Sequence, residues 1–380
     1  MDSSKELHRI IERRIERTGP ITFAEFMEIT LYHPQYGYYA SGRSWRGKGG
    51  DYFTSPTVHW LFGAMLGKQV AQMWKILSRD DFEIVEMGGG EGYLCYDILD
   101  YLKQREPLLY DCVRYISVEV SPRNSEEQRE LLGPFAEKVC WCVPDQLKTN
   151  GVTGCFLSNE LVDSFPVHRV IMQAGKLREI YVTVEDGILK DVFDKPSTTA
   201  LEEYFGRLGI SLVEGQEAEV NLEALRWLRH VAEILETGFV ITIDYGYSAT
   251  ELYSPHRKHG TLLCYRNHTV AADPYAYLGR QDITAHVDFT SLVACGEESG
   301  LAFAGLVPQY RFLLALGILE ELQSLAKRKG ELQSTDERLT IKNLILPGGM
   351  GDAFKVLIQH KGIAQPELDG LKQLANGGEL

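Results

Sequence analysis

A strand that runs into closely spaced glycines and then into a helix constrains this chain more than any other feature. The apolar segment 82–87 predicts the strand, segment 93–104 predicts the helix, and glycines stand at every second position between them. These glycines are Gly88, Gly90 and Gly92. A residue without a Cβ lets the backbone come close to a ligand, and the start of the helix offers free N–H groups. The pattern favours a nucleotide-binding turn, with a plain strand–turn–helix as the simpler alternative.

From residue 82 onward, predicted strands alternate with predicted helices, which is typical of a parallel sheet connected by crossovers. Further strands are expected at 115–120, 138–142, 154–157, 238–244, 301–307 and 354–359, and further helices at 221–235 and 310–327. Before residue 80 the chain is predicted to be helical around an irregular loop at 33–56, with Thr22 as a helix N-cap and Glu25 three residues later. Segment 168–213 breaks the alternation with a hairpin and a short helix, which indicates an inserted cap.

The formal net charge of -14 argues against a phosphate backbone as partner, and no dense basic stripe offsets it. Nucleic acid is therefore not expected to bind. No stretch approaches the ~18 uninterrupted apolar residues that a membrane helix needs, and residues 1–17 lack a secretory apolar region. The expectation is a cytoplasmic protein that does not insert into membranes, with a homodimer left open.

Seven cysteines stand at irregular spacings along the chain. The closest pair, Cys140 and Cys142, falls in an apolar run typical of a buried strand. Small reduced core residues are therefore expected, rather than a metal or disulfide site. No zinc or other metal is expected.

The acidic residues around the glycine turn indicate which nucleotide it binds. A dinucleotide fingerprint requires a third glycine where this chain has Tyr93. The spacing of Glu86 and the three glycines instead fits methyltransferases that use S-adenosylmethionine, with the acid near the methionine end of the cofactor. Glu119 ends the next predicted strand, where a carboxylate can accept hydrogen bonds from both ribose hydroxyls. A surface acid at a strand end is the alternative for Glu119.

Beyond the glycine turn, the chain resembles the MidA family, which comprises the mitochondrial complex I assembly methyltransferases and their bacterial relatives. The resemblance covers nearly the whole chain and rests on motifs at 31–39, 50–56, 62–63, 158–168, 243–247, 257–262 and 282–289. It implies a class I methyltransferase fold, a Rossmann-like α/β architecture with a seven-stranded sheet, an N-terminal helical cap and an inserted α/β cap. For the mitochondrial members it implies symmetric dimethylation of an arginine on a complex I subunit.

The expected division of the chain follows from this fold. Residues 1–80 form the N-terminal helical cap and a cofactor-covering loop, 81–167 the first part of the methyltransferase core, 168–216 the inserted cap, and 217–380 the remainder of the core. The expected cofactor is S-adenosylmethionine, and the loop at 51–56 is expected to close over its methionine end. The expected cofactor-binding residues are Asp51, Thr54, Ser55, Pro56, Glu86, Gly88, Gly90, Gly92, Glu119 and Asn159.

The segment after the fourth strand lies where this fold places its substrate, at the carboxyl ends of the strands. Methyl transfer from a sulfonium is an in-line displacement, so alignment and the exclusion of water are the enzyme's main tasks. If the acceptor is an arginine of a protein substrate, its guanidinium has a pKa above ~12, and carboxylates that orient it matter more than a free base. The expected catalytic residues are Glu160, Asp163 and His168.

Each of these residues also has a structural alternative. Glu160 and Asp163 fit a capping box for a short helix, and His168, like His286, fits a residue that orders a loop by hydrogen bonds. The three tyrosines within 36–39 either wall the acceptor channel or pack in a core.

Two departures from the family keep a second function open. Thr57 and Ala64 stand where the family usually has glutamate, which favours a cofactor-binding but non-catalytic assembly or partner-binding protein with the same fold. Transfer of labelled methyl groups to protein separates the two functions. A nicotinamide-dependent dehydrogenase is disfavoured by Tyr93.

Overall fold

The computed structural model describes residues 3–40, 55–147, 151–271, 273–329, 341–342, 344–346 and 350–373. The chain folds into two compact units. The core unit comprises Phe53–Leu161, Arg229–Tyr245 and Gly296–Leu380, and the accessory unit comprises Met1–Tyr52, Val162–Leu228 and Gly246–Cys295. Each unit is thus assembled from segments that lie far apart in the sequence.

The larger sheet has eight strands among the described residues, in the order β15-β16-β10-β5-β2-β3-β4, with β14 paired to the end of β10. The strands are β2 (Phe82–Met87), β3 (Val113–Val118), β4 (Val139–Cys142), β5 (Val152–Asn159), β10 (Leu235–Tyr247), β14 (Val287–Asp288), β15 (Ala302–Pro308) and β16 (Phe354–Lys361). Strands β4, β3, β2, β5 and β10 pair in parallel, whereas β16 is antiparallel to both of its neighbours. The sequence predicts seven strands, and β14 is the addition. Because β2, β3 and β5 are parallel, their carboxyl ends meet at one edge of the sheet, where ligands bind in open α/β folds.

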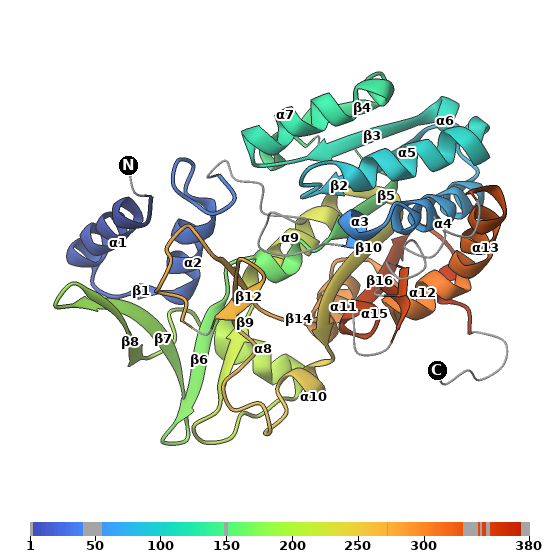
Figure 1. Ribbon diagram of the computed structural model, residues 1–380. Coiled ribbons are helices and arrows are strands. Elements are labelled where there is room, and N and C mark those ends of the chain that lie inside the picture. Colours follow the sequence, from blue (N-terminus) through green and yellow to red (C-terminus); the bar gives the residue numbers. More distant parts are fainter. Residues whose placement is uncertain are drawn as a thin grey trace. The chain divides into compact units, whose positions relative to one another are not determined.

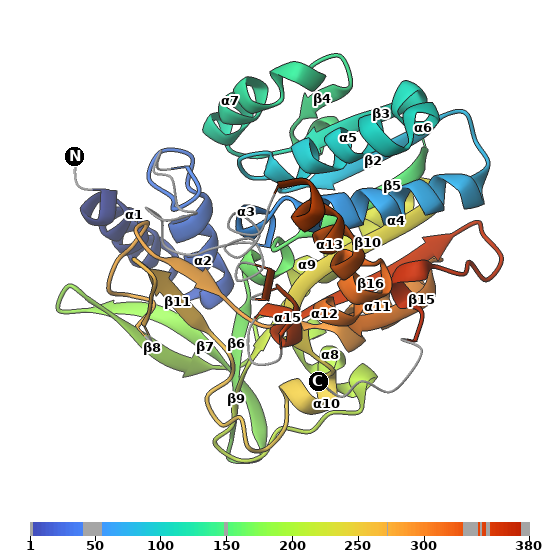
Figure 2. The ribbon, with the colours of Figure 1, turned by 45° about the vertical axis from the view of Figure 1, so that its right-hand side comes forward.

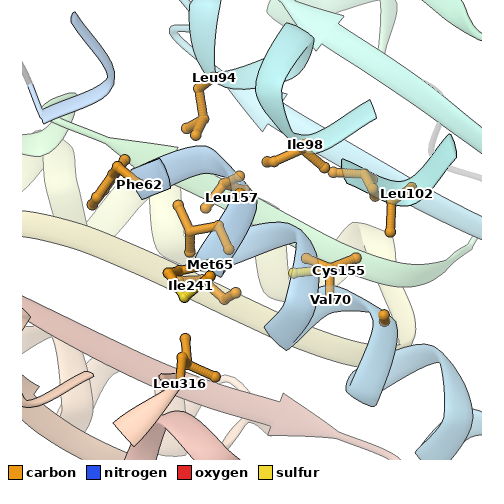
Figure 3. Packing of buried hydrophobic residues seen from close by; sticks show 14 of the residues in the cluster. Phe62, Met65, Val70, Leu94, Ile98, Leu102, Cys155, Leu157, Ile241 and Leu316 are labelled. Carbon is orange, nitrogen blue, oxygen red and sulfur yellow. The ribbon is translucent and has the colours of Figure 1, made fainter. Parts of the chain in front are cut away.

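Helices cover the sheet of the core unit and complete its hydrophobic core (Figures 1 and 2). They include α3 (Ser55–Val58), α4 (Leu61–Leu77), α5 (Tyr93–Arg105), α6 (Pro107–Cys112), α7 (Pro122–Leu131), α12 (Gln309–Ala315), α13 (Ile318–Lys329) and α15 (Met350–Ala353). Apolar side chains at every fourth position of α5 pack with α4 and with the buried faces of β5 and β10, because that spacing places them on one side of a helix. Figure 3 labels ten members of this cluster: Phe62, Met65, Val70, Leu94, Ile98, Leu102, Cys155, Leu157, Ile241 and Leu316.

The accessory unit is built on two antiparallel sheets. One has the order β1-β7-β6-β9, with β8 beside β7, and the other has the order β12-β11-β13. Their strands are β1 (Ile21–Thr22), β6 (His168–Gln173), β7 (Lys176–Glu185), β8 (Ile188–Asp194), β9 (Glu217–Val220), β11 (Leu263–Arg266), β12 (Thr269–Ala271) and β13 (Asp282–Thr284). Its helices include α1 (Ser3–Thr18), α2 (Phe23–Tyr32), α8 (Ala200–Leu208) and α10 (Ala249–Leu252), while α9 (Leu222–Ile234) and α11 (Phe289–Glu298) continue into the core unit.

Local predictions agree with the structure where they rest on local chemistry. The Thr22 hydroxyl accepts a hydrogen bond from the Glu25 N–H at 3.1 Å, which confirms the N-cap. The predicted hairpin is formed by β7 and β8. The single helix predicted at 310–327 is wrong, because α12 and α13 are separated at Gly317, whose φ of 86° lies in the left-handed region and interrupts the helix.

The expected division of the chain stays a prediction, and its boundaries do not coincide with those of the compact units. Helix α4 belongs to the core unit, although it lies within the expected N-terminal cap. Segment Gly246–Cys295 belongs to the accessory unit, although it lies within the expected core remainder. The accessory unit includes the N-terminal helices because β1 pairs with β7, Ile21 opposite Val182, and this pairing is long-range.

All seven cysteines are free thiols, but Cys140 is exposed and Cys142 is half-buried. The expectation of buried residues is wrong for Cys140, because Trp141 faces α7 and alternation along β4 turns its neighbours to the opposite face of the sheet. Within the described part of the chain, no helix has both the length and the apolar character required to cross a membrane.

Candidate active site

The glycine turn joins β2 to α5 through left-handed backbone. Gly88, Gly90 and Gly92 have φ values of 73°, 56° and 91°, which residues with a side chain rarely adopt. The Gly88 N–H donates to the Val118 carbonyl at 2.9 Å, so the turn is held against the end of β3. Gly92 precedes α5 directly without a side-chain cap, and the helix therefore begins with backbone N–H groups available to a ligand.

Close packing around the turn also favours glycine. A Cβ on Gly88 would lie 2.7 Å from Cδ1 of Leu161, and a Cβ on Gly92 would lie 3.0 Å from Cγ of Gln128. Leu161, which directly follows Glu160 in the chain, therefore packs against the turn. The turn that the sequence predicts is therefore present, with the backbone conformation that its glycines require.

Glu86 lies beneath the turn in the core of the unit. It is buried, and the Tyr115 hydroxyl donates to its Oε2 at 2.8 Å. Burial raises the pKa of Tyr115 well above its ordinary value, and the Glu86 carboxylate raises it further, so Tyr115 stays a hydrogen-bond donor at neutral pH. A Cβ on Gly89 would lie 3.0 Å from the Glu86 carboxyl carbon, which shows how closely this carboxylate underlies the glycines.

Glu119 follows β3 and accepts a hydrogen bond from the middle of the turn. Its Oε2 accepts from the Gly90 N–H at 3.1 Å, and its Oε1 accepts from the Ser121 N–H at 2.8 Å. The carboxylate is buried, so the surface-acid alternative is wrong. Each carboxylate oxygen can accept more than one hydrogen bond, and the expected contact with a ribose stays a prediction.

Gln128 is a positioning residue that sequence reasoning missed. Its side chain is 1% exposed, and its Nε2 donates to the Gly90 carbonyl at 2.7 Å. Its Oε1 accepts from the Ser117 hydroxyl at 2.6 Å and from Trp141 Nε1 at 3.0 Å. In the sequence it is one polar residue of a polar helix, and no local signal distinguishes it.

Replacing Gln128 by methionine, which is similar in length but apolar, is expected to destabilise the protein by about 2–4 kcal/mol. The substitution removes the shared partner of Gly90, Ser117 and Trp141, and buried polar groups that lose a partner bear the desolvation cost. Urea unfolding measures the effect. The exposed Gln104→Met is the matched control and should change stability by less than about 0.5 kcal/mol, and an equally small effect for Gln128→Met would contradict the positioning role.

Glu160 follows β5 in a left-handed conformation with a φ of 51°. Its N–H donates to the Ile243 carbonyl at 2.9 Å, and its Oε1 accepts from the Ser55 N–H at 3.0 Å and from Asn159 Nδ2 at 3.1 Å. Left-handed backbone at a residue with a side chain costs free energy and is concentrated at functional sites. The carboxylate therefore accepts from the first N–H of the short helix α3, a contact of the kind that the helix-cap alternative describes, and the expected catalytic role of Glu160 stays a prediction.

The segment that begins at Ser55 is anchored a second time. The Ser55 hydroxyl donates to Gln309 Oε1 at 3.2 Å, and both side chains are fully buried. Gln309 opens α12 and was missed by sequence reasoning, because it is 254 residues from Ser55. Pro56 lies in α3, whereas Asp51 and Thr54, both expected to bind cofactor, lie outside the described residues.

Asp163 belongs to the accessory unit, where it lies in the 3-10 helix η3 (Val162–Ser164). Its side chain is buried, and its carbonyl accepts from the Ala285 N–H at 3.0 Å. The Tyr32 hydroxyl hydrogen-bonds to the carbonyl and the hydroxyl of Ser164, each at 3.0 Å. These contacts fix the position of η3 within its unit.

His168 and His286 both make structural contacts. The Nδ1 of His168 is 2.7 Å from Oε1 of the buried Glu179, and although burial favours the neutral acid, hydrogen bonds from His168 and Ser197 bring the pKa of Glu179 below its ordinary value. Burial, and then the nearby Arg257, lowers the pKa of His286 to about 4, so it is neutral and a weak base at pH 7. The geometry of His168 fits the loop-ordering alternative, and a catalytic role for His168 stays a prediction.

Of the tyrosines of segment 36–39, Tyr38 packs in a core, and a place for Tyr36 and Tyr39 in the acceptor channel stays a prediction. Tyr38 is fully buried in the apolar cluster of the accessory unit. Tyr36 stacks on the ring of His33 at 5.2 Å, and the Tyr39 hydroxyl donates to Asp282 Oδ1 at 2.8 Å.

Among the described residues, no group of three or more histidine, cysteine or acidic side chains is arranged to hold a metal.

Curated relatives align with nearly the whole chain. Protein arginine methyltransferase NDUFAF7 of Mus musculus, a mitochondrial protein, is 28% identical over 373 residues, which cover 90% of this chain and 81% of that protein. The Drosophila melanogaster homologue is 28% identical over 405 residues, with 96% and 86% covered. These relatives, like those of human and cattle, are named as mitochondrial, which points away from a cytoplasmic location, so the expectation of a cytosolic protein is wrong. The homodimer and the exclusion of nucleic acid stay predictions.

A solved structure supports the cofactor directly. A Burkholderia thailandensis protein bound to S-adenosylhomocysteine matches with a TM-score of 0.88 and 30% identity, covering 97% of this chain and 95% of that one. The cofactor of the chain is S-adenosylmethionine, as expected from the glycine turn. A model of a family of S-adenosyl-L-methionine-dependent methyltransferases matches residues 65–307. This chain belongs to that family and is an S-adenosylmethionine-dependent methyltransferase.

Proposed function

We propose that this methyltransferase acts on arginine side chains of a protein substrate. The observation that carries the proposal is the alignment of about nine-tenths of the chain with relatives named as protein arginine methyltransferases. The enzyme's own residues add support, because they offer a nucleoside-binding turn and buried carboxylates suited to a cationic acceptor.

The residues of the core unit fit the cofactor. The glycine turn leads into α5 without a side-chain cap, so helix N–H groups are available to a ligand, and Glu119 follows the neighbouring strand. Asn159 Oδ1 and Gln309 Nε2 are buried and lack a hydrogen-bond partner among the described residues. An acceptor and a donor of this kind match the ammonium and the carboxylate at the methionine end of S-adenosylmethionine, which supports the expected positions of Ser55 and Glu86 near that end.

The acceptor side of the reaction calls for orientation of a cation. S-adenosylmethionine, when bound, supplies a methyl group on a positively charged sulfur. Glu160 orients the guanidinium so that one nitrogen lies in line with the S–CH3 bond. As the N–C bond forms, the S–C electron pair stays on sulfur and the nitrogen loses a proton to the Glu160 carboxylate. A catalytic role for Asp163, which lies in the accessory unit, stays a prediction. The fixed position of Glu160, set by Ser55 and Asn159, reduces the reorganisation required at that moment.

A partner-binding protein without activity is the second candidate. Ala64 favours it, because this residue is buried in the apolar cluster of the core unit where the family usually has a glutamate. Transfer of labelled methyl groups to protein separates the two candidates.

Labelled S-adenosylmethionine is added with the purified full chain to a lysate from cells of the source organism whose own copy of the gene is deleted, so that acceptors are unmethylated. We expect the label in protein, and in ω-N-methylated arginine after acid hydrolysis and amino-acid analysis. A second reaction without the enzyme measures background. Label in another amino acid would contradict the arginine specificity, and no transfer above background would favour the partner-binding candidate.

A further inference from the structure

Asp282 opens β13 in the accessory unit and was not among the expected site residues. It is 2% exposed, and its Oδ1 accepts from the Tyr39 hydroxyl at 2.8 Å. Strand β13 pairs antiparallel with β11, so that Asp282 lies opposite Tyr265 and Thr284 lies opposite Leu263. Because side chains alternate along a strand, Asp282 and Thr284 share one face of this small sheet.

Asp163 lies close to the end of β13. Its carbonyl accepts from the N–H of Ala285, the residue after β13. Burial raises the pKa of Tyr265, and Asp163 and then Asp282 raise it further. Burial likewise raises the pKa of Tyr32. A hydrogen bond with Ser164 lowers this pKa, and the charges of Asp282 and Asp163 raise it further. Asp282 lies opposite Tyr265 in the sheet, and Asp163 directly precedes Ser164, the hydrogen-bond partner of Tyr32. The two carboxylates therefore lie near these two phenols, although they are far apart in the sequence.

Thr284 supplies an independent indication of a ligand. It is 3% exposed, and its Oγ1 has no hydrogen-bond partner among the described residues. Buried hydroxyls in folded proteins are almost always hydrogen-bonded, because an unmade bond leaves the desolvation cost uncompensated. The hydroxyl shares its face of the sheet with Asp282, so a donor brought to that carboxylate can also reach it.

Aromatic rings complete this environment. The rings of Tyr32 and Tyr39 are 5.3 Å apart and tilted by 38°, and Tyr39 and Tyr265 are each partly exposed. Faces of tyrosine rings attract cations, and a planar cation stacks on them.

We propose that Asp282, Thr284 and Asp163 form the subsite that selects a guanidinium side chain as methyl acceptor. The proposal rests on the proposed function and names its specificity residues. A guanidinium presents five N–H donors in a plane, which can pair with two carboxylates and a hydroxyl at once, whereas an ammonium presents three donors around a point and a citrulline presents no charge. Asp282 is thus a substrate-binding residue, held in place by Tyr39.

The test uses the full chain saturated with S-adenosylhomocysteine and three peptides, Gly-Gly-Xaa-Gly-Gly, in which the central residue is arginine, lysine or citrulline. We expect the arginine peptide to bind at least about 10-fold more tightly than the other two by calorimetry or saturation-transfer NMR. Asp282→Asn should remove about 10-fold or more of this affinity while the affinity for S-adenosylhomocysteine is unchanged.

Thr284→Val keeps the proposal testable if Asp282→Asn fails to fold. The valine has the same shape and removes a buried hydroxyl that lacks a partner, so the melting temperature should stay level or rise while binding of the arginine peptide weakens. The matched control is Asp191→Asn, since Asp191 also accepts from a tyrosine hydroxyl, that of Tyr275, in the same unit. This control should bind the arginine peptide as the wild type does.

The proposal is overturned if the wild type does not prefer the arginine peptide, or if folded Asp282→Asn and Thr284→Val both bind it as the wild type does. If methylarginine forms in the lysate but both variants bind the arginine peptide as the wild type does, this subsite is refuted and the proposed function stands. Label in another amino acid together with arginine-specific binding at Asp282 would instead refute the proposed function.

Discussion

Glu160→Gln is expected to lower methyl transfer about 100-fold while the affinity for S-adenosylhomocysteine stays close to that of the wild type. Glutamine retains an oxygen that can accept from the Ser55 N–H and from Asn159 Nδ2, so the local structure survives. It lacks the negative charge that, in the proposed function, orients a cationic acceptor. The measurement is transfer of labelled methyl groups to lysate protein beside a calorimetric cofactor titration on the same preparation.

The matched control is Glu137→Gln, which removes one charge from an exposed position of the core unit and should leave both quantities unchanged. Retained transfer with a small drop in melting temperature would show that Glu160 acts only as a structural link. A parallel loss of cofactor binding would move Glu160 from the acceptor site to the cofactor site.

Gly90→Val is expected to weaken the binding of S-adenosylhomocysteine by more than about 100-fold, because a branched side chain at a φ of 56° forces the turn to change its backbone conformation. The same change displaces the Gly90 N–H from Glu119 and the Gly90 carbonyl from Gln128. Calorimetry measures the affinity, and circular dichroism establishes that the variant is folded.

Gly209→Val tests whether backbone strain by itself explains the loss. Gly209 has a φ of 64° at the C-cap of α8, and no heavy atom lies within 4 Å of the position that its Cβ would take. This variant carries the same kind of strain away from the cofactor and should bind S-adenosylhomocysteine normally. A folded Gly90→Val protein with wild-type affinity would refute the assignment of the turn as the cofactor site.

At the candidate site, the sequence predicts the carboxylates but not the two glutamine side chains. Glu86, Glu119 and Glu160 were found because each ends or follows an apolar run, and in a parallel sheet such ends meet at one edge. Gln128 and Gln309 were not found, because each lies in a helix where a polar residue is ordinary. Their importance arises only from partners on other elements, Gly90 and Ser55.

The division of the chain shows the same limit. The sequence predicts a separate N-terminal cap and a separate insertion, since each differs in pattern from the alternating core. In the structure these segments share one apolar cluster with residues 264–285. No pattern along the chain indicates that sharing, because it is formed by side chains that meet only after folding.

The sequence by itself determined the strand, the glycine turn and the helix that begins at Tyr93, as well as the N-cap at Thr22. These features depend on backbone preferences and hydrophobic spacing within a few residues, so they can be read locally. Only the tertiary structure decided that Ser55 meets Glu160, that Tyr39 meets Asp282 and that β1 pairs with β7. Those contacts join residues 105 to 243 positions apart, and they form because burial and hydrogen bonding are satisfied for the whole chain at once rather than segment by segment.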